Sequence, residues 1–272
     1  MTSADCALIA ELCAERVGLR VDPEATYVID SRLGPLARRE GFASVSELAH
    51  TLAARTDERL ITAAVEAMAP AETAFFRDRA TLERLWSETI PEIARRKADG
   101  VVRVWSAGCA SGQEIYSLAM LQAEQRAPTG QVELYASDYA ERLMDRARAG
   151  TYSSFEVQRG LSARELVRHF ENRGDQFQLN RALRQAVRWR CVNLLDDLSA
   201  LGRFDVVLCR NVLSSLTPAA RARVLKRLDG VLADDGLLVL GSGEEAEGLA
   251  AFAPAAGMAS GFVRAGRVQQ AA

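Results

Sequence analysis

Histidine and paired cysteine are nearly missing from this sequence, and with them the usual side chains for metal binding. The 272 residues include two histidines and five cysteines, and no two cysteines form a C-x-x-C pair. Protein zinc and iron–sulfur sites need several thiolates or imidazoles at short spacings. We therefore expect no metal site. Unpaired cysteines also fit a reducing compartment, where thiols stay free.

A long apolar run is missing as well. No segment approaches the ~20 consecutive apolar residues that a membrane-spanning helix requires. Asp5 and Glu11 interrupt the N-terminal region, where a signal peptide has an unbroken apolar core. The sequence therefore predicts a cytoplasmic protein without direct membrane insertion. The lack of a heptad pattern or a long exposed apolar stripe favours a monomer.

Neither sign of charge is in excess. There are 34 Lys and Arg residues against 36 Asp and Glu residues, a formal net charge of -2. This balance gives no overall attraction to nucleic acid or to an anionic membrane, so we expect no nucleic-acid partner. A charged partner would have to meet a local patch. The most basic stretch is residues 173–190, with Arg173, Arg181, Arg184, Arg188 and Arg190.

The most informative stretch is residues 101–121. A short β-branched run turns through small residues around Gly108 and Gly112, and helical spacing follows from Ile115 onward. This pattern predicts a strand, a tight loop and a helix, with small residues and unpaired helix N–H groups facing one ligand site. The spacing lacks both G-x-G-x-x-G and a P-loop lysine, so neither a nicotinamide nor a nucleoside triphosphate is favoured.

A second strand-like run, residues 132–137, ends in Asp138. This acid stands 30 residues after Gly108. In nucleotide-type α/β folds, an acid at the end of the second strand commonly accepts hydrogen bonds from a ribose. The structural alternative is that Asp138 is the N-cap of a helix over residues 140–149.

The alternation of strands and helices after residue 100 predicts the fold class. Further strands are expected at 189–193, 204–209, 237–241 and 261–264, and a further helix at 217–228. This order is typical of an α/β fold with a doubly wound, mostly parallel sheet. Residues 4–68 show only helical patterns. We therefore predict an N-terminal all-helical domain over residues 1–69 and a second domain over residues 70–272.

Three local patterns predict particular helix ends and faces. Asp22-Pro23 offers an N-cap followed by proline at the first helical position, for a helix that runs to Glu40. A helix over residues 81–90 is expected to stop at Pro91. Thr73 and Arg77 are four residues apart, so on a helical turn they would share a face.

The basic stretch predicts a small antiparallel β insertion at about residues 172–190. Its strands are expected at 176–179 and 186–190. The positive charge suits an acidic protein surface, and a solvated hairpin is the alternative.

Several separated motifs resemble those of one family, the bacterial chemotaxis receptor methyltransferases of the CheR type. The matching pieces are residues 73–78, 104–109, 112–119, 136–138, 192–194, 209–213 and 238–244. The resemblance covers almost the whole chain. It implies a class I S-adenosylmethionine-dependent methyltransferase fold, S-adenosylmethionine as cofactor, and methyl transfer to glutamate side chains in the cytoplasmic domain of chemoreceptors. It also implies that the basic insertion corresponds to the β-subdomain with which some members hold a receptor tail.

The resemblance assigns roles to individual residues. Arg77 would be catalytic, close to the transferred methyl group, and we expect it to position the substrate carboxylate. The residues expected to bind the cofactor are Thr73, Arg77, Gly108, Glu114, Asp138, Asn193, Leu194, Arg210 and Asn211. Among them, Glu114 would lie beside the methionine and ribose, Asp138 would hold the ribose hydroxyls, and Asn193-Leu194 would flank the adenine.

The chain departs from the family pattern at a few positions. Ala71 replaces an asparagine, Gln113 a second glutamate, Ile115 a proline and Ala140 a second aspartate, while Ser214-Ser215 replace an aliphatic residue and a tyrosine. These losses leave open a catalytically degenerate homologue that binds the cofactor or a receptor as a regulator or scaffold. A methyltransferase for nucleic acid or a small molecule is a third reading, but the Asn/Asp-Pro-Pro-aromatic motif of amino-methylating enzymes is missing.

Overall fold

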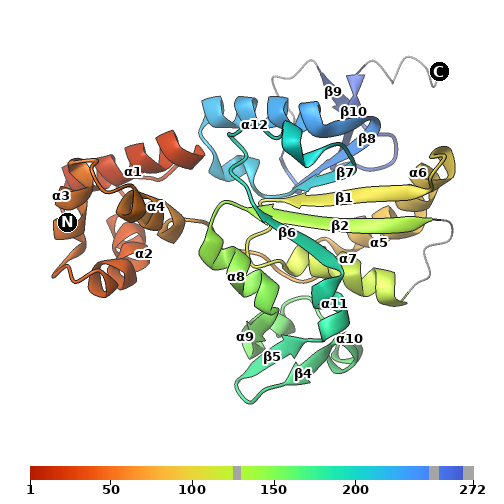
Figure 1. The fold of residues 1–272 in the computed structure, drawn as a ribbon, viewed down its shortest axis with the longest axis horizontal. Helices are drawn as coiled ribbons and strands as arrows, with labels where there is room; N and C mark the ends of the chain where they lie inside the picture. The colour runs from red at the N-terminus through yellow and green to blue at the C-terminus, as the bar shows by residue number, and fades with distance from the viewer. Residues whose placement is uncertain (125–129, 245–250, 266–272) are drawn as a thin grey trace. The chain divides into compact units, whose positions relative to one another are not determined.

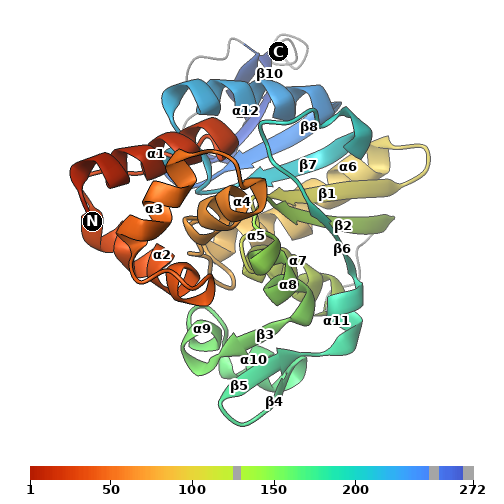
Figure 2. The same cartoon turned by 60° about the vertical axis from the view of Figure 1, so that its left-hand side comes forward.

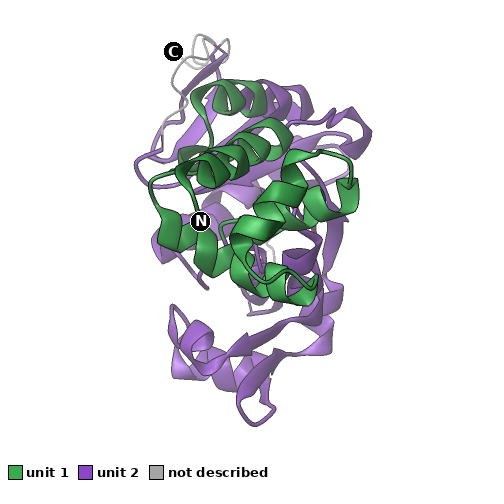
Figure 3. Ribbon diagram, turned by 90° about the vertical axis from the view of Figure 1, so that its left-hand side faces the viewer, with its two compact units in different colours: residues 1–70, 213–224 green, residues 71–212, 225–272 purple. Residues whose placement is uncertain are grey.

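The computed structural model describes residues 1–124, 130–244 and 251–265. The chain separates into two compact units, Met1–Pro70 with Leu213–Val224, and Ala71–Val212 with Leu225–Ala272 (Figure 3). The return of Leu213–Val224 to the helical unit was not apparent from the sequence. Within that unit it is tied by the amide of Thr217, which donates to Gly18 O at 2.9 Å.

The first unit is helical. Its helices are α1 (Ser3–Val17), α2 (Thr26–Arg39), α3 (Val45–Ala53), α4 (Glu58–Ala67), the 3-10 turn Leu213–Ser215 and the start of α12 (Pro218–Val231). Side chains close the helix starts: Thr2 caps α1, Ser44 caps α3 and Asp57 caps α4. The apolar stripe of each helix, including Ile29 and Leu33 of α2, is buried.

The prediction that Asp22 caps a helix was wrong. The N-cap of α2 is Ala25, and Asp22 Oδ1 instead accepts from the amide of Glu24 at 2.9 Å. Aspartate side chains readily bond the backbone two residues on, and this local bond competes with helix capping. Asp22-Pro23 therefore forms a turn, and the helix begins later.

Within the described residues of the second unit, seven strands form one sheet in the order β6-β2-β1-β7-β8-β10-β9 (Figure 1). Their bounds are β1 (Val101–Ala107), β2 (Gln131–Asp138), β6 (Val187–Cys191), β7 (Phe204–Cys209), β8 (Leu232–Leu240), β9 (Phe252–Pro254) and β10 (Gly261–Arg264). The pairs from β6 to β8 are parallel, and β10 is antiparallel to β8 and β9. This confirms the predicted mostly parallel sheet.

Helices cover both faces of this sheet. On one face lie α7 (Gln113–Glu124) and α8 (Glu141–Ala149), which are side by side in Figure 2 and joined by a hydrogen bond from Tyr116 to Ala147 O at 2.7 Å. Residues 225–231 of α12 lie on the other face (Figure 1). Alternate residues of β1 and β2 are buried in the same apolar cluster as α7, as the alternation of a strand requires: Val102, Val104, Val132, Leu134 and Ala136.

The predicted stop at Pro91 did not occur. The helical segment runs as α5 (Arg79–Arg84), a π-helical turn (Leu85–Thr89) and α6 (Ile90–Arg96). Proline cannot donate the usual hydrogen bond, and its ring clashes with the preceding turn of a regular α-helix. The wider π-helical turn before it accommodates the ring, so the chain stays helical.

A second, smaller sheet is inserted after α8, and it corrects the predicted insertion at residues 172–190. In the described chain it contains β3 (Thr151–Ser153), β4 (Phe170–Asn172) and β5 (Gln176–Leu179), all antiparallel. The short helices α9 (Ser154–Gln158), α10 (Ala163–His169) and α11 (Arg181–Gln185) accompany it. We call residues 151–185 the β-subdomain.

The strand expected at residues 186–190 does not belong to the β-subdomain. It is part of β6, which pairs in parallel with β2. Trp189 is half-buried, and its ring packs against Tyr116 of α7, a contact that favours pairing with the main sheet. The arginines on either side of Trp189 gave the stretch the alternating pattern of a solvated hairpin, which misled the prediction.

Among the described residues, no helix combines the length and apolar character that a membrane span requires. In the same residues, His, Cys, Asp and Glu side chains form no group of three or more that could hold a metal ion. All five cysteines lie in the described ranges. Cys191 is exposed, and Cys6, Cys13, Cys109 and Cys209 are buried.

We predict that one thiol per native chain reacts with a disulfide reagent at pH 8. Burial raises the pKa of Cys13 to about 12 and raises the pKa of Cys109 and Cys209 as well, so these thiols remain protonated and inaccessible. Titration with Ellman's reagent should give one thiol in buffer and all five in denaturant. Cys191→Ser should abolish the reaction in buffer, and rapid reaction of a second thiol would contradict the described burial.

Candidate functional site

The loop after β1 turns sharply at the carboxyl end of the sheet. Gly108 has a φ of 75°, and a Cβ there would lie 2.7 Å from Val212 Cγ2. The amides of Gly108 and Cys109 both donate to Ser137 O at 2.9 Å. The loop is therefore fixed against the end of β2, and only glycine fits at its first position.

Asp138 joins the same two strand ends. Its carboxylate accepts from the amide of Ala110 at 2.9 Å and from the amide of Ala140 at 3.1 Å, and the residue is buried. The alternative prediction, that Asp138 is the N-cap of a helix over residues 140–149, was wrong. The N-cap of α8 is Ala140, and no side chain caps that helix. An ionised carboxylate is a hydrogen-bond acceptor with several lone-pair sites.

Arg210, directly after β7, is the centre of the site. Its side chain is 1% exposed. One guanidinium nitrogen donates to Glu114 Oε2 at 2.8 Å and to Arg77 O at 3.1 Å, and the other pairs with Asp78. The remaining nitrogen, Nε, is buried and has no hydrogen-bond partner among the described residues.

Glu114, at the start of α7, is held from two sides. Besides the bond from Arg210, Ser106 donates its hydroxyl to Glu114 Oε1 at 2.9 Å. Ser106 belongs to β1, so the carboxylate is fixed between the end of one strand and the beginning of the next helix. The side chain retains 13% exposure. It can therefore still accept a bond from a bound molecule.

Arg77 lies in a turn and not on a helix. Phe76 and Asp78, its neighbours, have φ values of 49° and 52°. Thr73 and Arg77 therefore do not lie on a helix and do not share a helical face. Thr73 is half-buried in the irregular segment before the turn, and the Arg77 side chain is exposed while Phe76 is buried.

The remaining predicted residues follow the ends of β6 and β7. Asn193 Oδ1 accepts from the amide of Leu195 at 3.0 Å and shapes the loop after β6, in which Leu194 is half-buried. Asn211 has a φ of 59°, and its amide donates to Glu244 Oε2 at 2.7 Å.

Two residues without a predicted role belong to this arrangement. Asp78 pairs with Arg210, and Glu244 Oε2 accepts from the amides of Asn211 and Gly241. Both stand inside motifs that carry the resemblance, at residues 73–78 and 238–244, so the motifs were a signal for them. A cavity of about 380 Å³ adjoins them, lined in part by Arg84, Met258 and Ser260.

The structure thus brings Arg77, Glu114 and Arg210 into one network, and links Gly108 to Asp138 through the end of β2. In an open parallel sheet the carboxyl ends of the strands meet at one edge, where ligands bind. Gly108 follows β1, and Asp138 is the last residue of β2. Glu114 lies at the start of α7, and Arg210 follows β7, whereas Arg77 precedes α5. The arrangement is that of a ligand site with several carboxylate acceptors and one unsatisfied buried donor.

Comparison with known proteins gives consistent matches. Residues 71–258 match the family model described as the SAM binding domain of CheR methyltransferase. Chemotaxis protein methyltransferase Cher2 of Pseudomonas putida is 35% identical over 238 residues, which cover 85% of this chain and 86% of that protein. Chemotaxis protein methyltransferase 1 of Pseudomonas aeruginosa is 34% identical, over 89% of this chain and 90% of that one.

Among solved structures, PKMT2 from Rickettsia typhi in complex with AdoHcy superimposes with a TM-score of 0.39 at 14% identity. The superposition covers 63% of this chain, and the chain spans 26% of that protein.

We predict that Arg210→Lys destabilises the protein. A lysine ammonium cannot present the planar fork that serves Glu114, Asp78 and the Arg77 carbonyl together. Leaving buried acceptors without a donor should cost about 2 kcal/mol of the free energy of unfolding, or roughly 4–8 °C in Tm for a chain of this size. Thermal unfolding followed by circular dichroism measures this loss. A Tm equal to that of the native sequence would show that the network does not hold the site together.

Proposed function

Because the chain belongs to the CheR methyltransferase family, we propose that it transfers a methyl group from S-adenosylmethionine to glutamate side chains of bacterial chemoreceptors. It is an S-adenosylmethionine-dependent methyltransferase. The observation that best supports the finer proposal is the buried Arg210, which holds an acid of the cofactor region, Glu114, and the backbone of Arg77 in one hydrogen-bonded network.

The residues present fit the cofactor. S-adenosylmethionine has ribose hydroxyls, an ammonium group and a carboxylate, which call for acceptors and a donor. Asp138 and Glu114 are the acceptors, and the buried Nε of Arg210 is a donor that still lacks a partner among the described residues. The cofactor supplies an electrophilic methyl group on a positively charged sulfur.

We assign each residue a part in holding it. Asp138 accepts from the ribose hydroxyls, Glu114 accepts from the methionine end, and Gly108 lets the backbone come close. Asn193 and Leu194 flank the adenine, and Thr73, Arg210 and Asn211 complete the pocket. Arg77 is the residue that meets the substrate, because its side chain is exposed while its backbone is fixed by Arg210.

The reaction needs no general base. A glutamate carboxylate with an ordinary pKa of about 4.3 is already ionised at pH 7 and is itself the nucleophile. The protein must align that carboxylate with the methyl group and exclude water, which is catalysis by orientation and fixed charge. We propose that Arg77 attracts and orients the carboxylate of the substrate glutamate. We also propose that the cavity beside Asp78 and Glu244 receives the part of the receptor chain next to that glutamate.

The setting follows from this substrate. A chemoreceptor presents its glutamates on a cytoplasmic domain, so we propose that the enzyme works in the cytoplasm, as a monomer. We also keep the division into an N-terminal helical domain, residues 1–69, and a methyltransferase domain, residues 70–272, as a proposal. Chemoreceptor adaptation is the process that such methylation serves.

The degenerate homologue is the alternative. Of the departures that suggest it, Gln113 counts least, because its side chain is 1% exposed and accepts from the Ser111 hydroxyl at 2.8 Å. Glutamine there serves the start of α7. The replacement of a family tyrosine by Ser215 is the stronger motive for this alternative.

The decisive test is calorimetric titration with S-adenosylmethionine and S-adenosylhomocysteine, followed by methyl transfer to a purified chemoreceptor cytoplasmic domain. Binding with base-labile methylation of glutamates would support the proposal. Binding without transfer to any receptor domain would favour the regulatory homologue, and activity gained by Ser215→Tyr in that inactive protein would settle the matter for degeneration.

We predict that Arg77→Ala lowers the rate of receptor methylation at least about 100-fold, since orientation of the nucleophile is lost. The affinity for S-adenosylmethionine should change far less, because the fixed backbone of residue 77 and not its side chain contacts the network. Radiolabelled methyl transfer and calorimetry measure the two effects. The matched control is Arg223→Ala, an exposed arginine on α12. Equal losses of rate and affinity would assign Arg77 to cofactor binding instead.

A further inference from the structure

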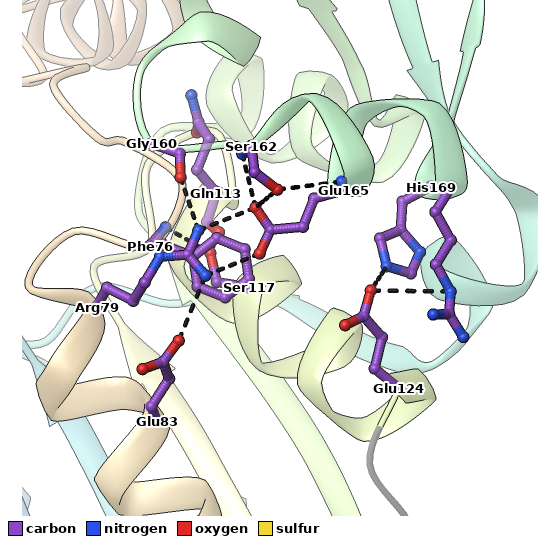
Figure 4. Close-up of polar contacts among 11 residues, drawn as sticks. Phe76, Arg79, Glu83, Gln113, Ser117, Glu124, Gly160, Ser162, Glu165 and His169 are labelled. Carbon is purple, nitrogen blue, oxygen red and sulfur yellow. Dashed lines mark hydrogen bonds and ion pairs between the residues drawn. The ribbon is translucent and has the colours of Figure 1, made fainter.

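The turn that carries Arg77 is anchored to the β-subdomain by an ion pair. Arg79 donates to both carboxylate oxygens of Glu165, at 2.8 and 2.9 Å, and to Gly160 O at 2.9 Å (Figure 4). Glu165 lies on α10, 86 residues further along the chain. A two-pronged contact of this kind fixes orientation as well as distance.

Glu165 is preorganised for this contact. It closes a capping box at the start of α10, where the amide and hydroxyl of Ser162 both donate to Oε2. Its side chain is 12% exposed. Burial acts to raise the pKa of Glu165, but the bonds from Arg79 and Ser162 outweigh it and the pKa is lowered. Because the folded-state pKa lies below the ordinary value, the ion pair persists at neutral pH and is lost only as the pH falls through the acid range.

The backbone of the turn touches the β-subdomain directly. A Cβ on Gly160 would lie 1.8 Å from Phe75 O, so only glycine permits this approach. The Phe75 ring packs edge-on against Tyr152 and Phe170, with centroids 5.0 and 5.6 Å away. The turn is therefore seated on the β-subdomain through side chain and main chain.

The other side of the turn meets α7. The amide of Phe76 donates to Ser117 Oγ at 2.9 Å, and the Arg79 guanidinium lies over the Phe76 ring, 3.8 Å from its centroid. The far end of α10 is joined to the same helix, because His169 Nε2 is 2.7 Å from Glu124 Oε1 (Figure 4). Thus α10 and α7 hold the turn between them.

This support is needed because the turn is strained. Phe76 and Asp78 both adopt the left-handed backbone region, and each such non-glycine residue costs roughly 1 kcal/mol or more. A conformation of this kind persists only where its surroundings fix it. Arg77 stands between the two strained residues, so its direction depends on the anchors.

We propose that Arg79 is a positioning residue for methyl transfer. Its ion pair with Glu165 fixes the turn of residues 75–78 and so the direction of the Arg77 side chain, which makes the rate of transfer depend on the β-subdomain. This inference rests on the proposed function, because it takes Arg77 as the residue that orients the substrate carboxylate.

The chain provides a closely matched control. Glu156 closes the capping box of α9 with Ser153 just as Glu165 does for α10, and it pairs with Arg146. Its side chain is 20% exposed, against 12% for Glu165. Arg146 and Arg79 are likewise 42% and 37% exposed. Neither Arg146 nor Glu156 bonds to the turn of residues 75–78 in the described structure.

The experiment compares Glu165→Gln with Glu156→Gln in the full chain. Glutamine still closes a capping box, so both variants keep their helix start, while the ion pair loses its negative charge and one accepting oxygen. For Glu165→Gln we expect kcat for receptor methylation to fall at least about 10-fold, with the affinity for S-adenosylmethionine unchanged, because misplacing a reacting group is costly. Glu156→Gln should leave kcat unchanged. Arg79→Lys keeps the positive charge but loses the two-pronged contact. Its kcat should lie between that of the native protein and that of Glu165→Gln.

A second readout does not depend on the substrate. Hydrogen exchange at the amide of Phe76, which is bonded to Ser117, should accelerate in Glu165→Gln and stay native in Glu156→Gln. If the native protein methylates no receptor, the proposed function fails while this exchange difference still supports the anchor. Equal exchange rates in the two variants, or equal kcat values in an active enzyme, would overturn the positioning role of Arg79.

Discussion

The buried guanidinium of Arg210 is the interaction on which the site depends. Removing such a charge from water costs several kcal/mol, and the cost is offset only when opposite charges and hydrogen bonds surround it. Glu114, Asp78 and the Arg77 carbonyl supply them. These acceptors come from α7 and from a turn far away in the chain. The need to satisfy one cation therefore draws three segments to the end of β7 and gives them one geometry.

The parallel sheet sets the second constraint, because it brings the ends of β1, β2, β6, β7 and β8 to one edge. The positions of Gly108, Asp138 and Arg210 at strand ends were predictable from the spacing of apolar runs. The roles expected for Glu114, Asn193 and Arg210 came from the resemblance and not from spacing. What spacing could not reveal is burial. Arg210, assigned from the sequence to line a cofactor pocket, also satisfies three oxygen acceptors of the protein itself, and Asp138 also accepts two backbone amides.

The errors of prediction have local causes. The strand at residues 186–190 was placed in a hairpin because its arginines alternate with apolar residues, whereas the contact of Trp189 with Tyr116 of α7 pulls it into the main sheet. Pro91 was taken as a stop because sequence patterns assume an α-helix, and a π-helical turn evades the clash. Asp22 accepts a hydrogen bond from the amide of Glu24 in its own turn and therefore does not cap α2. In each of these three cases, a tertiary contact, a local hydrogen bond or a π-helical backbone, which the sequence pattern does not reveal, determined the structure.

Seen together, these contacts explain how an exposed arginine can be directed. Arg77 has a mobile side chain by nature, since arginine has many rotamers and this one faces solvent. Its backbone is nonetheless held by Arg210 through its carbonyl, by Ser117 through the amide of Phe76, and by the seat of Phe75 on Gly160. Fixing the backbone on both sides limits the directions in which the guanidinium can reach. The methyl transfer proposed above needs alignment more than proton transfer, because its proposed nucleophile is already charged, and such a reaction gains most from a restraint of this kind.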